Sequence, residues 1–177
     1  MLFRLFVIAL AATSLGSCQK AGGKADAKAP EATAQASEPT PEGKAFLEKT
    51  AKEPGVKPLS DGILYKVVRS GPTTGLKPQL GDEIKVHYEG KLIDGTVFDS
   101  SYDRGQPAAM ELRQLIPAWE KALPQMRAGD EWILYVPPAQ GYGAEGTPGG
   151  PIGPNAVLVF RIELIDLLPR PGRVQQG

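Results

Sequence analysis

The sequence predicts an α+β domain in which a twisted antiparallel β-sheet wraps around one short α-helix. Residues 83–90 alternate apolar and polar side chains, as a half-buried strand does. The pair Asp94-Gly95, between two β-rich runs, is typical of a tight hairpin turn. The run Pro117–Leu123 starts at a proline suited to the first turn of a helix, and Pro124 follows it. One helix lying across an antiparallel sheet is an α+β arrangement.

Residues 1–17 have the composition of a signal peptide. Arg4 supplies a positive charge, and the apolar run 5–15 is too short to span a bilayer. The run ends in Leu-Gly-Ser before Cys18, which resembles the lipobox of bacterial lipoproteins, where the cysteine is acylated. The alternative is an ordinary secretory signal with an incidental cysteine, but Cys18 is the single cysteine of the chain. We therefore expect a lipid anchor on Cys18 in the bacterial cell envelope, facing the periplasm. Gln19, rather than Asp, follows the cysteine, which resembles the pattern of Gram-negative lipoproteins that are exported to the outer membrane.

The next segment combines an expected tether with an expected short helix. Residues 18–40 contain no aromatic residue and are rich in Ala, Lys, Thr and Pro, so they predict a flexible tether. A helix is expected over residues 41–55, with Thr40 as its cap and Pro54-Gly55 as its stop. The pattern leaves open whether this helix docks on the domain or frays. The side chains available for packing are Ala45, Phe46, Leu47 and Ala51.

One folded domain is expected over residues 56–170, followed by a disordered tail over 171–177. In the strand 83–90, strand alternation places Ile84, Val86 and Tyr88 on one face. The last strand shows the same alternation. The expected strands cover residues 62–69, 83–90, 91–93, 96–98, 108–112, 131–136 and 156–167.

Charge and residue types exclude several classes of protein. Lys plus Arg equals Asp plus Glu at 20 each, so there is no basic excess of the kind that nucleic-acid binders usually carry. One His and one Cys cannot supply a catalytic triad or a His/Cys metal site, so we expect no metal and no cofactor. His87 is a candidate base. Because strand alternation turns it away from Tyr88, a structural or solvent-facing histidine is favoured.

Five motifs follow one another along the domain. They are Val86-His87-Tyr88-Glu89-Gly90, Gly95-Thr96-Val97-Phe98-Asp99-Ser100-Ser101, Leu115-Ile116-Pro117-Ala118-Trp119-Glu120, Gly141-Tyr142-Gly143 and Ala156-Val157-Leu158-Val159-Phe160. In this order and at this spacing they resemble the FKBP-type peptidyl-prolyl isomerases, over a stretch from about Gly62 to Leu168.

The resemblance implies an apolar pocket for proline. Trp119 resembles the floor of that pocket, and Tyr142 resembles the tyrosine that hydrogen-bonds a ligand carbonyl. Asp99 resembles the carboxylate that contacts the twisted imide or a neighbouring tyrosine. With Phe98, these are the expected catalytic residues. The expected substrate-binding residues are Tyr88, Arg104, Leu115, Ile116, Ile152 and Phe160.

Ordinary core packing is the alternative explanation for the aromatic residues Tyr88, Trp119 and Phe160. A carboxylate next to Phe98 is harder to explain as core, because a buried carboxylate without a partner is costly. The presence of Asp99 among these residues therefore favours a binding pocket over ordinary core packing.

The same resemblance implies peptidyl-prolyl isomerase activity on unfolded or folding polypeptides that contain proline, with macrolide inhibitors as further ligands. Ala108 stands where many relatives carry an aromatic residue, which we expect to weaken macrolide binding more than turnover. The N-terminal segment is expected to be too short for a helical dimerisation domain, so we expect a monomer. The alternatives are a proline-binding holdase or adaptor with little turnover, and a structural lipoprotein, which would not explain the pocket residues.

Overall fold

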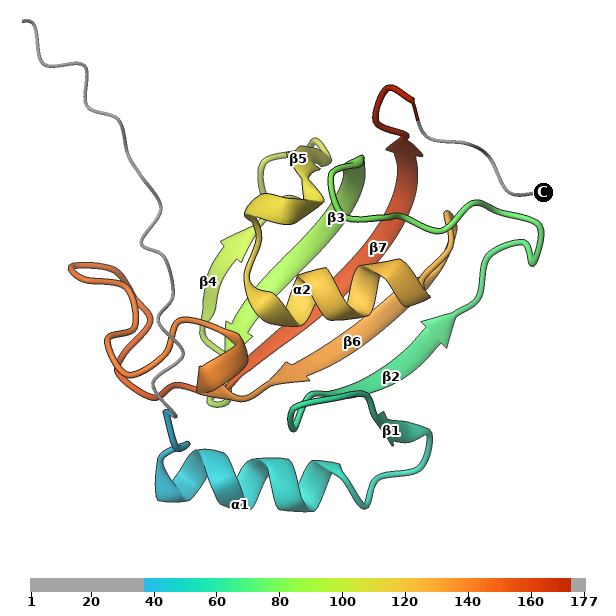
Figure 1. Ribbon diagram of the computed structural model, residues 1–177. Helices are drawn as coiled ribbons and strands as arrows, with labels where there is room; N and C mark the ends of the chain where they lie inside the picture. Colours follow the sequence, from blue (N-terminus) through green and yellow to red (C-terminus); the bar gives the residue numbers. More distant parts are fainter. Residues whose placement is uncertain (1–36, 173–177) are drawn as a thin grey trace, which may run out of the picture. The chain divides into compact units, whose positions relative to one another are not determined.

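The protein is built on a seven-stranded antiparallel sheet with strand order β1-β2-β6-β7-β3-β4, in which β5 also pairs with β3 (Figure 1). The computed structural model describes residues 37–172, which belong to one compact unit. The strands are β1 (Val56–Pro58), β2 (Leu64–Arg69), β3 (Glu83–Leu92), β4 (Val97–Ser100), β5 (Ala108–Glu111), β6 (Glu131–Val136) and β7 (Leu158–Leu168). The α-helices are α1 (Pro41–Thr50) and α2 (Pro117–Ala122), and the 3₁₀ turns are η1 (Leu112–Gln114), η2 (Leu123–Gln125) and η3 (Pro138–Gln140). The predicted α+β class is confirmed.

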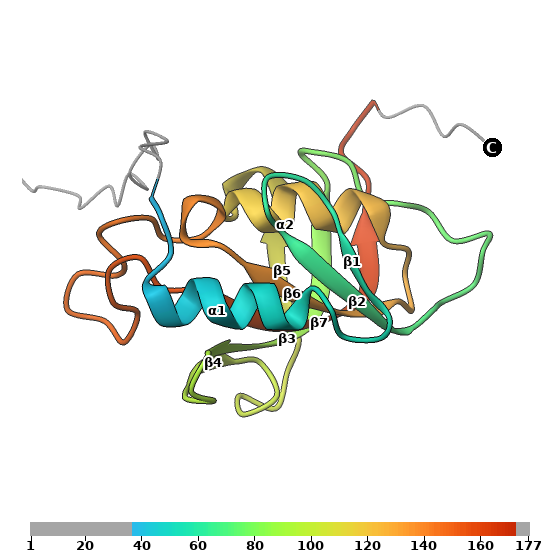
Figure 2. The same cartoon turned by 90° about the horizontal axis from the view of Figure 1, so that it is seen from below.

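The core lies between α2 and one face of the sheet (Figures 1 and 2). On β3, Ile84 and Val86 are fully buried and Lys85 is exposed, as the alternation predicts. The same face of β7 carries Leu158 and Phe160, both buried. From α2, Trp119 completes this core.

The hairpin between β3 and β4 turns at the predicted dipeptide. Gly95 has φ of 91°, a conformation that glycine adopts without the cost of a side chain. The Asp94 Oδ1 atom accepts a hydrogen bond from the Thr96 backbone N–H at 2.8 Å, which closes the turn. This hairpin brings Asp99 opposite Gly90.

Helix α1 docks on the sheet, which the sequence pattern left open. Thr40 caps it as expected, since its Oγ1 accepts from the Gly43 N–H at 3.1 Å. Ala45 and Ala51 are exposed, so their predicted packing role is wrong. The residues that face the domain, three and four positions apart, are Gly43, Phe46, Leu47 and Thr50.

Two contacts hold α1 in place. The Phe46 ring lies 6.1 Å from the Tyr135 ring of β6. A side chain at Gly43 would come within 2.8 Å of Val157 Cγ2, so glycine lets the helix approach closely. Tyr135 alternates with the core residues Leu134 and Val136, so α1 contacts the sheet face opposite α2.

The strand β1 has no counterpart in the sequence prediction. It is three residues long and pairs only with β2, where Val56 lies opposite Lys66. A segment this short shows no usable period of its own, and it follows Pro54-Gly55, which suggested a turn. Pairing with β2 turns this segment into a strand.

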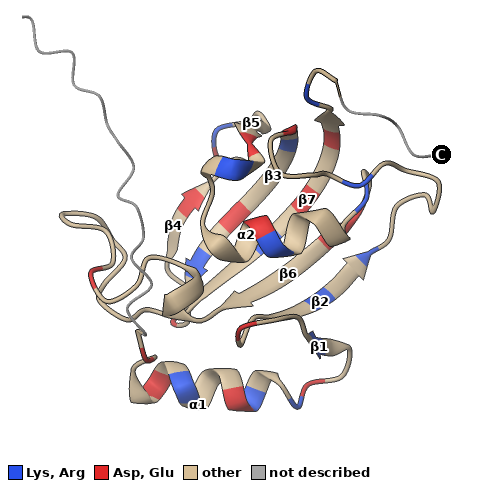
Figure 3. Ribbon diagram, in the orientation of Figure 1, with Lys and Arg blue, Asp and Glu red and all other residues tan. Residues whose placement is uncertain are grey.

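Basic and acidic residues are interspersed over the helices and strands (Figure 3). No helix within residues 37–172 is long and apolar enough to cross a membrane. The predicted signal peptide, Cys18, nearly all of the tether, and residues 173–177 of the tail lie outside the described residues.

Candidate active site

A phenol, a carboxylate and a guanidinium meet at the edge of the aromatic core. Tyr88 lies on β3, Asp99 on β4, and Arg104 in the turn after β4. The Tyr88 hydroxyl donates to Asp99 Oδ2 at 2.5 Å, and Arg104 pairs with Asp99 Oδ1. Arg104 also donates to the Tyr88 oxygen at 3.0 Å, and its guanidinium carbon lies 5.4 Å from the centre of the Tyr88 ring. Each of the three groups therefore contacts the other two.

These contacts lower the pKa of Asp99 and raise the pKa of Tyr88, so that both values lie further from neutral pH. Burial raises the pKa of Asp99, but the hydrogen bonds from Tyr88 and Arg104 outweigh burial and hold the pKa below its ordinary value. Burial, followed by the bond to Asp99, raises the pKa of the Tyr88 phenol. Asp99 is therefore an anion near neutral pH and Tyr88 a neutral donor.

Three perpendicular aromatic contacts form the floor beside this cluster. Trp119 lies in the first turn of α2, with Tyr88 at 5.3 Å and Phe160 at 5.5 Å between ring centres. Phe98 meets Phe160 at 5.6 Å. Edge-to-face packing places the positive rim of one ring against the negative face of the next. The indole Nε1 of Trp119 is buried and has no hydrogen-bond partner among the described residues.

Gly90 makes the position of Phe98 possible. A Cβ at Gly90 would lie 2.6 Å from two atoms of the Phe98 ring and 3.0 Å from Phe160. No side chain other than hydrogen fits there. Sequence reasoning quoted Gly90 as part of a motif but assigned it no role; only the packing of Phe98 across β3 reveals one.

The aliphatic residues predicted for the pocket lie in two segments. Leu115 and Ile116, between η1 and α2, are half-buried and pack against the core. Ile152 is 5% exposed and belongs to the core itself. Its N–H donates to Thr147 Oγ1 at 3.2 Å and its carbonyl accepts from the Thr147 N–H at 2.9 Å. These bonds close the loop that follows Tyr142.

Tyr142 lies at the edge of the site and is 40% exposed. Burial and, secondly, the charge of Asp99 raise the pKa of its phenol, so its hydroxyl lies within the electrostatic reach of that carboxylate. Tyr142 is thus brought toward Asp99 from a loop 43 positions along the chain.

Comparisons with known proteins identify the family of the chain. The family model of the FKBP-type peptidyl-prolyl cis-trans isomerase matches residues 75–165, and the model of the domain amino terminal to that isomerase matches residues 10–67. The chain belongs to the FKBP-type peptidyl-prolyl cis-trans isomerase family.

Several FKBP relatives are known by sequence. The peptidyl-prolyl cis-trans isomerase Mip of Coxiella burnetii is 50% identical over 124 residues, which are 70% of this chain and 53% of the relative. The outer membrane protein MIP of Legionella longbeachae is 44% identical over 133 residues, 75% of this chain and 56% of the relative. The chain therefore spans about half the length of these curated relatives.

Solved FKBP structures match as well. The crystal structure of FkpA from Escherichia coli has a TM-score of 0.69 at 45% identity, covering 73% of this chain and 59% of that one. A peptidyl-prolyl cis-trans isomerase from Pseudomonas syringae has a TM-score of 0.67 at 41% identity, covering 72% of this chain and 92% of that one. The second match covers nearly the whole of a solved isomerase.

The side chain of His87, the candidate base, contacts Ser101 and Tyr102 and makes no hydrogen bond to Tyr88, Asp99 or Arg104 among the contacts of the described residues. Its Nδ1 is 2.9 Å from the hydroxyl of Ser101, and its ring stacks on Tyr102 at 4.6 Å. Sequence reasoning missed Ser101 and Tyr102. The available signal was the second serine of the Phe-Asp-Ser-Ser motif, which had no assigned partner.

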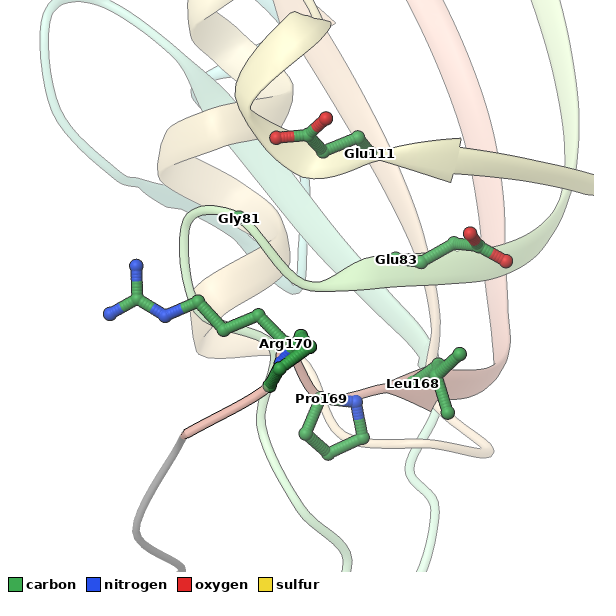
Figure 4. Close-up of a pocket in the computed structure, with 7 residues that line it drawn as sticks. Gly81, Glu83, Glu111, Leu168, Pro169 and Arg170 are labelled. Atoms are coloured by element: carbon green, nitrogen blue, oxygen red, sulfur yellow. The ribbon is translucent and has the colours of Figure 1, made fainter.

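Two shallow depressions on the described surface lie apart from the aromatic cluster. One is lined by Gly81, Glu83, Glu111, Leu168 and Arg170, among others (Figure 4). The other adjoins it and shares Glu83 and Leu168. Neither is lined by Tyr88, Asp99 or Trp119. Within residues 37–172 no group of His, Cys, Asp and Glu could hold a metal ion.

Proposed function

We propose that this chain catalyses the cis–trans isomerisation of X–Pro bonds in exported polypeptides. The observation that carries the proposal is the Tyr88–Asp99–Arg104 cluster set against the Trp119 floor, in a chain of the FKBP family. Trp119 and Phe160 offer flat apolar surfaces on which a pyrrolidine ring can pack. We assign the roles of substrate wall to Tyr88, Phe98, Leu115, Ile116 and Ile152.

The reaction needs no covalent step. Amide resonance imposes a rotation barrier of about 18–20 kcal/mol. Resonance separates charge, with the positive end on nitrogen and the negative end on oxygen. An apolar surface stabilises this planar form less than water does, whereas the twisted form has lost the charge separation. Catalysis is then preferential binding of the twisted amide.

The polar groups of the site orient the rotating bond. The Tyr142 hydroxyl, at the edge of the site, is assigned as donor to the carbonyl that precedes proline. The charge of Asp99 is paired with Arg104, and Asp99 also accepts a hydrogen bond from Tyr88, so this carboxylate can lie beside an apolar pocket at a modest desolvation cost. Its lowered pKa argues against a role as a proton donor near neutral pH.

The direct test is an isomerisation assay on the full chain with a peptide containing one X–Pro bond. The uncatalysed reaction takes tens to hundreds of seconds, so acceleration is readily resolved. We expect first-order acceleration that is proportional to enzyme concentration. Binding of unfolded polypeptide without any acceleration would instead support the holdase.

We further propose that the protein is anchored in the bacterial envelope by lipid on Cys18. The support is the lipobox-like sequence before Cys18, and a relative whose name is outer membrane protein MIP. Stable anchoring requires more than one acyl chain, which a lipoprotein cysteine carries. Cys18→Ser should give a folded protein that leaves the membrane fraction. A mutant that still sediments with membranes after a salt wash would contradict the anchor.

A further inference from the structure

The outer edge of β3 is shared by two short strands, and a gap lies between them. β5 pairs with residues 83–86 of β3, and β4 pairs with residues 89–91. His87 and Tyr88 lie in the gap. A buried backbone N–H in such a gap needs an acceptor from elsewhere.

Ser101 supplies both halves of the missing pairing at Tyr88. Its backbone N–H donates to the Tyr88 carbonyl at 2.9 Å, as a strand residue would. Its side-chain oxygen accepts from the Tyr88 N–H at 2.8 Å, in place of a ladder carbonyl. Ser101 is fully buried, so water does not offer an alternative acceptor.

The remaining contacts of this hydroxyl leave its role at Tyr88 unchanged. The Ser101 Oγ lies 3.2 Å from the Tyr88 carbonyl and 2.9 Å from His87 Nδ1. A serine hydroxyl has one proton and two lone pairs. Its proton can go to the carbonyl or to the imidazole, and in either case a lone pair stays available to the Tyr88 N–H.

We propose that Ser101 is the positioning residue that aligns Tyr88 with Asp99 and Arg104, an inference that rests on the proposed isomerase function. Asp99 precedes Ser101 by two residues and Arg104 follows it by three. One buried hydroxyl thus joins the strand that carries the phenol to the segment that carries the carboxylate and the guanidinium. Misplacing the groups of an active site by about 1 Å can lower the rate of the reaction by about a hundredfold.

Ser100 offers a matched control. It is 5% exposed, and its Oγ accepts from the Asp103 N–H at 3.1 Å, away from Tyr88. Ser101→Ala and Ser100→Ala each remove one buried hydroxyl, from adjacent positions. Ser100→Ala loses the bond from the Asp103 N–H, whereas Ser101→Ala loses the bond from the Tyr88 N–H and the contacts with the Tyr88 carbonyl and His87. If Ser101 were merely structural, its variant would lose stability but would keep the kcat of Ser100→Ala.

The first test is turnover by the full chain, below the unfolding temperature of each variant. We expect Ser101→Ala to lower kcat about tenfold with KM near the wild-type value, because alignment rather than affinity is lost. Ser100→Ala should change kcat by less than about twofold. If Ser101→Ala does not fold, Ser101→Cys replaces it, since a thiol is a weaker acceptor, and an intermediate loss of kcat is expected.

The second test does not depend on turnover. Titration of ¹³C-labelled tyrosine by NMR follows the Tyr88 phenol directly. Burial, the main cause of the raised pKa of Tyr88, stays in Ser101→Ala, but the bond to Asp99, the second cause, is weakened. The pKa of Tyr88 should therefore fall part of the way from its raised value in Ser101→Ala and should stay at the wild-type value in Ser100→Ala. Equal Tyr88 titrations in the two variants would overturn the inference even if wild type isomerises proline. An inactive wild type with the shifted titration would overturn the proposed function and support the positioning role.

Discussion

At the scale of single residues, the Asp99 carboxylate accepts hydrogen bonds from two side chains, a phenol and a guanidinium, that come from different segments. Tyr88 reaches it from β3 and Arg104 from the turn after β4. A carboxylate between a phenol and a guanidinium stays ionised, which makes Asp99 an electrostatic and orienting group. Tyr142 adds a second hydroxyl at the edge of the same site.

Asp99→Ala and Tyr142→Phe should each lower kcat/KM by roughly five- to tenfold, about 1–1.4 kcal/mol, while the fold survives, because each removes one polar group to which we assign a role at the rotating bond. The measurement is the peptide isomerisation assay, with circular dichroism for folding. Asp103→Ala is the control, since Asp103 is an exposed carboxylate four residues from Asp99. Full activity in both site variants would show that the residue assignment is wrong.

The pKa shifts predict activity that is flat across neutral pH. The pKa of Asp99 is lowered, so the stabilisation from its ionised form is complete above the ordinary carboxyl value of about 3.9 and is lost as pH falls through the folded pKa. The pKa of Tyr88 is raised, so the contribution of the neutral phenol is complete below about pH 10 and is lost as pH rises through the folded pKa. Neither transition lies between pH 6 and 8.

The check is kcat/KM across that range for wild type and His87→Ala. Histidine is the residue type that ordinarily changes charge in this window. A step in wild type that disappears in His87→Ala would mean that His87 takes part, and the account based on desolvation would have to be abandoned.

At the scale of elements, α1 is a short helix held by its docked face. Isolated helices of this length are marginal in water, so its order depends on contacts such as Phe46 with Tyr135. Glu48, on the opposite side of the helix, is exposed.

Phe46→Ala should therefore lower stability by about 1 kcal/mol, a shift of a few degrees in Tm, because a half-buried aromatic contact is lost. Thermal unfolding followed by circular dichroism measures it. Glu48→Ala, in the same helix, should leave Tm nearly unchanged. Equal values of Tm for the two variants would contradict the docked position of α1.

At the scale of the whole molecule, the core and the proposed pocket share a floor. Trp119 is 4% exposed and packs with Ala118, Ala122 and the buried face of the sheet. The same ring faces Tyr88, whose hydroxyl belongs to the polar cluster. Stability and activity are thus coupled at this residue.

Trp119→Ala should cost roughly 3–5 kcal/mol of unfolding free energy and should also reduce isomerisation, since it empties the core and removes the pocket floor. Urea unfolding of the full chain measures the first effect and the peptide assay the second. Trp132→Ala is the control, because Trp132 belongs to the same core, is 7% exposed and stacks on Tyr65. Its indole nitrogen, like that of Trp119, has no hydrogen-bond partner within residues 37–172. A Trp119→Ala protein that keeps full activity below its Tm would rule out the floor assignment.

The sequence by itself determined the elements whose signal is local. Strand alternation in residues 83–90, the Asp94-Gly95 turn and the prolines around α2 all act over a few neighbouring residues, and all were predicted correctly. The resemblance to the FKBP family placed Asp99 and Trp119 at one site, and the structure brings Tyr88 into contact with both.

Tertiary structure alone decided the contacts between segments that are distant along the chain. The Ser101 hydroxyl accepts from the Tyr88 N–H only because the chain after β4 folds back against β3. In the same way, the absence of a side chain at Gly90 matters only because the Phe98 ring packs against it. The docked face of α1 and the strand β1 depend on the sheet for the same reason. Of the four side chains predicted to be available for packing, Phe46 and Leu47 are half-buried and Ala45 and Ala51 are exposed, while close approach to Val157 buries Gly43. The period of apolar residues along a helix or strand indicates which side chains can be buried. The neighbouring segments that pack against the element decide which of those side chains are buried in the folded protein.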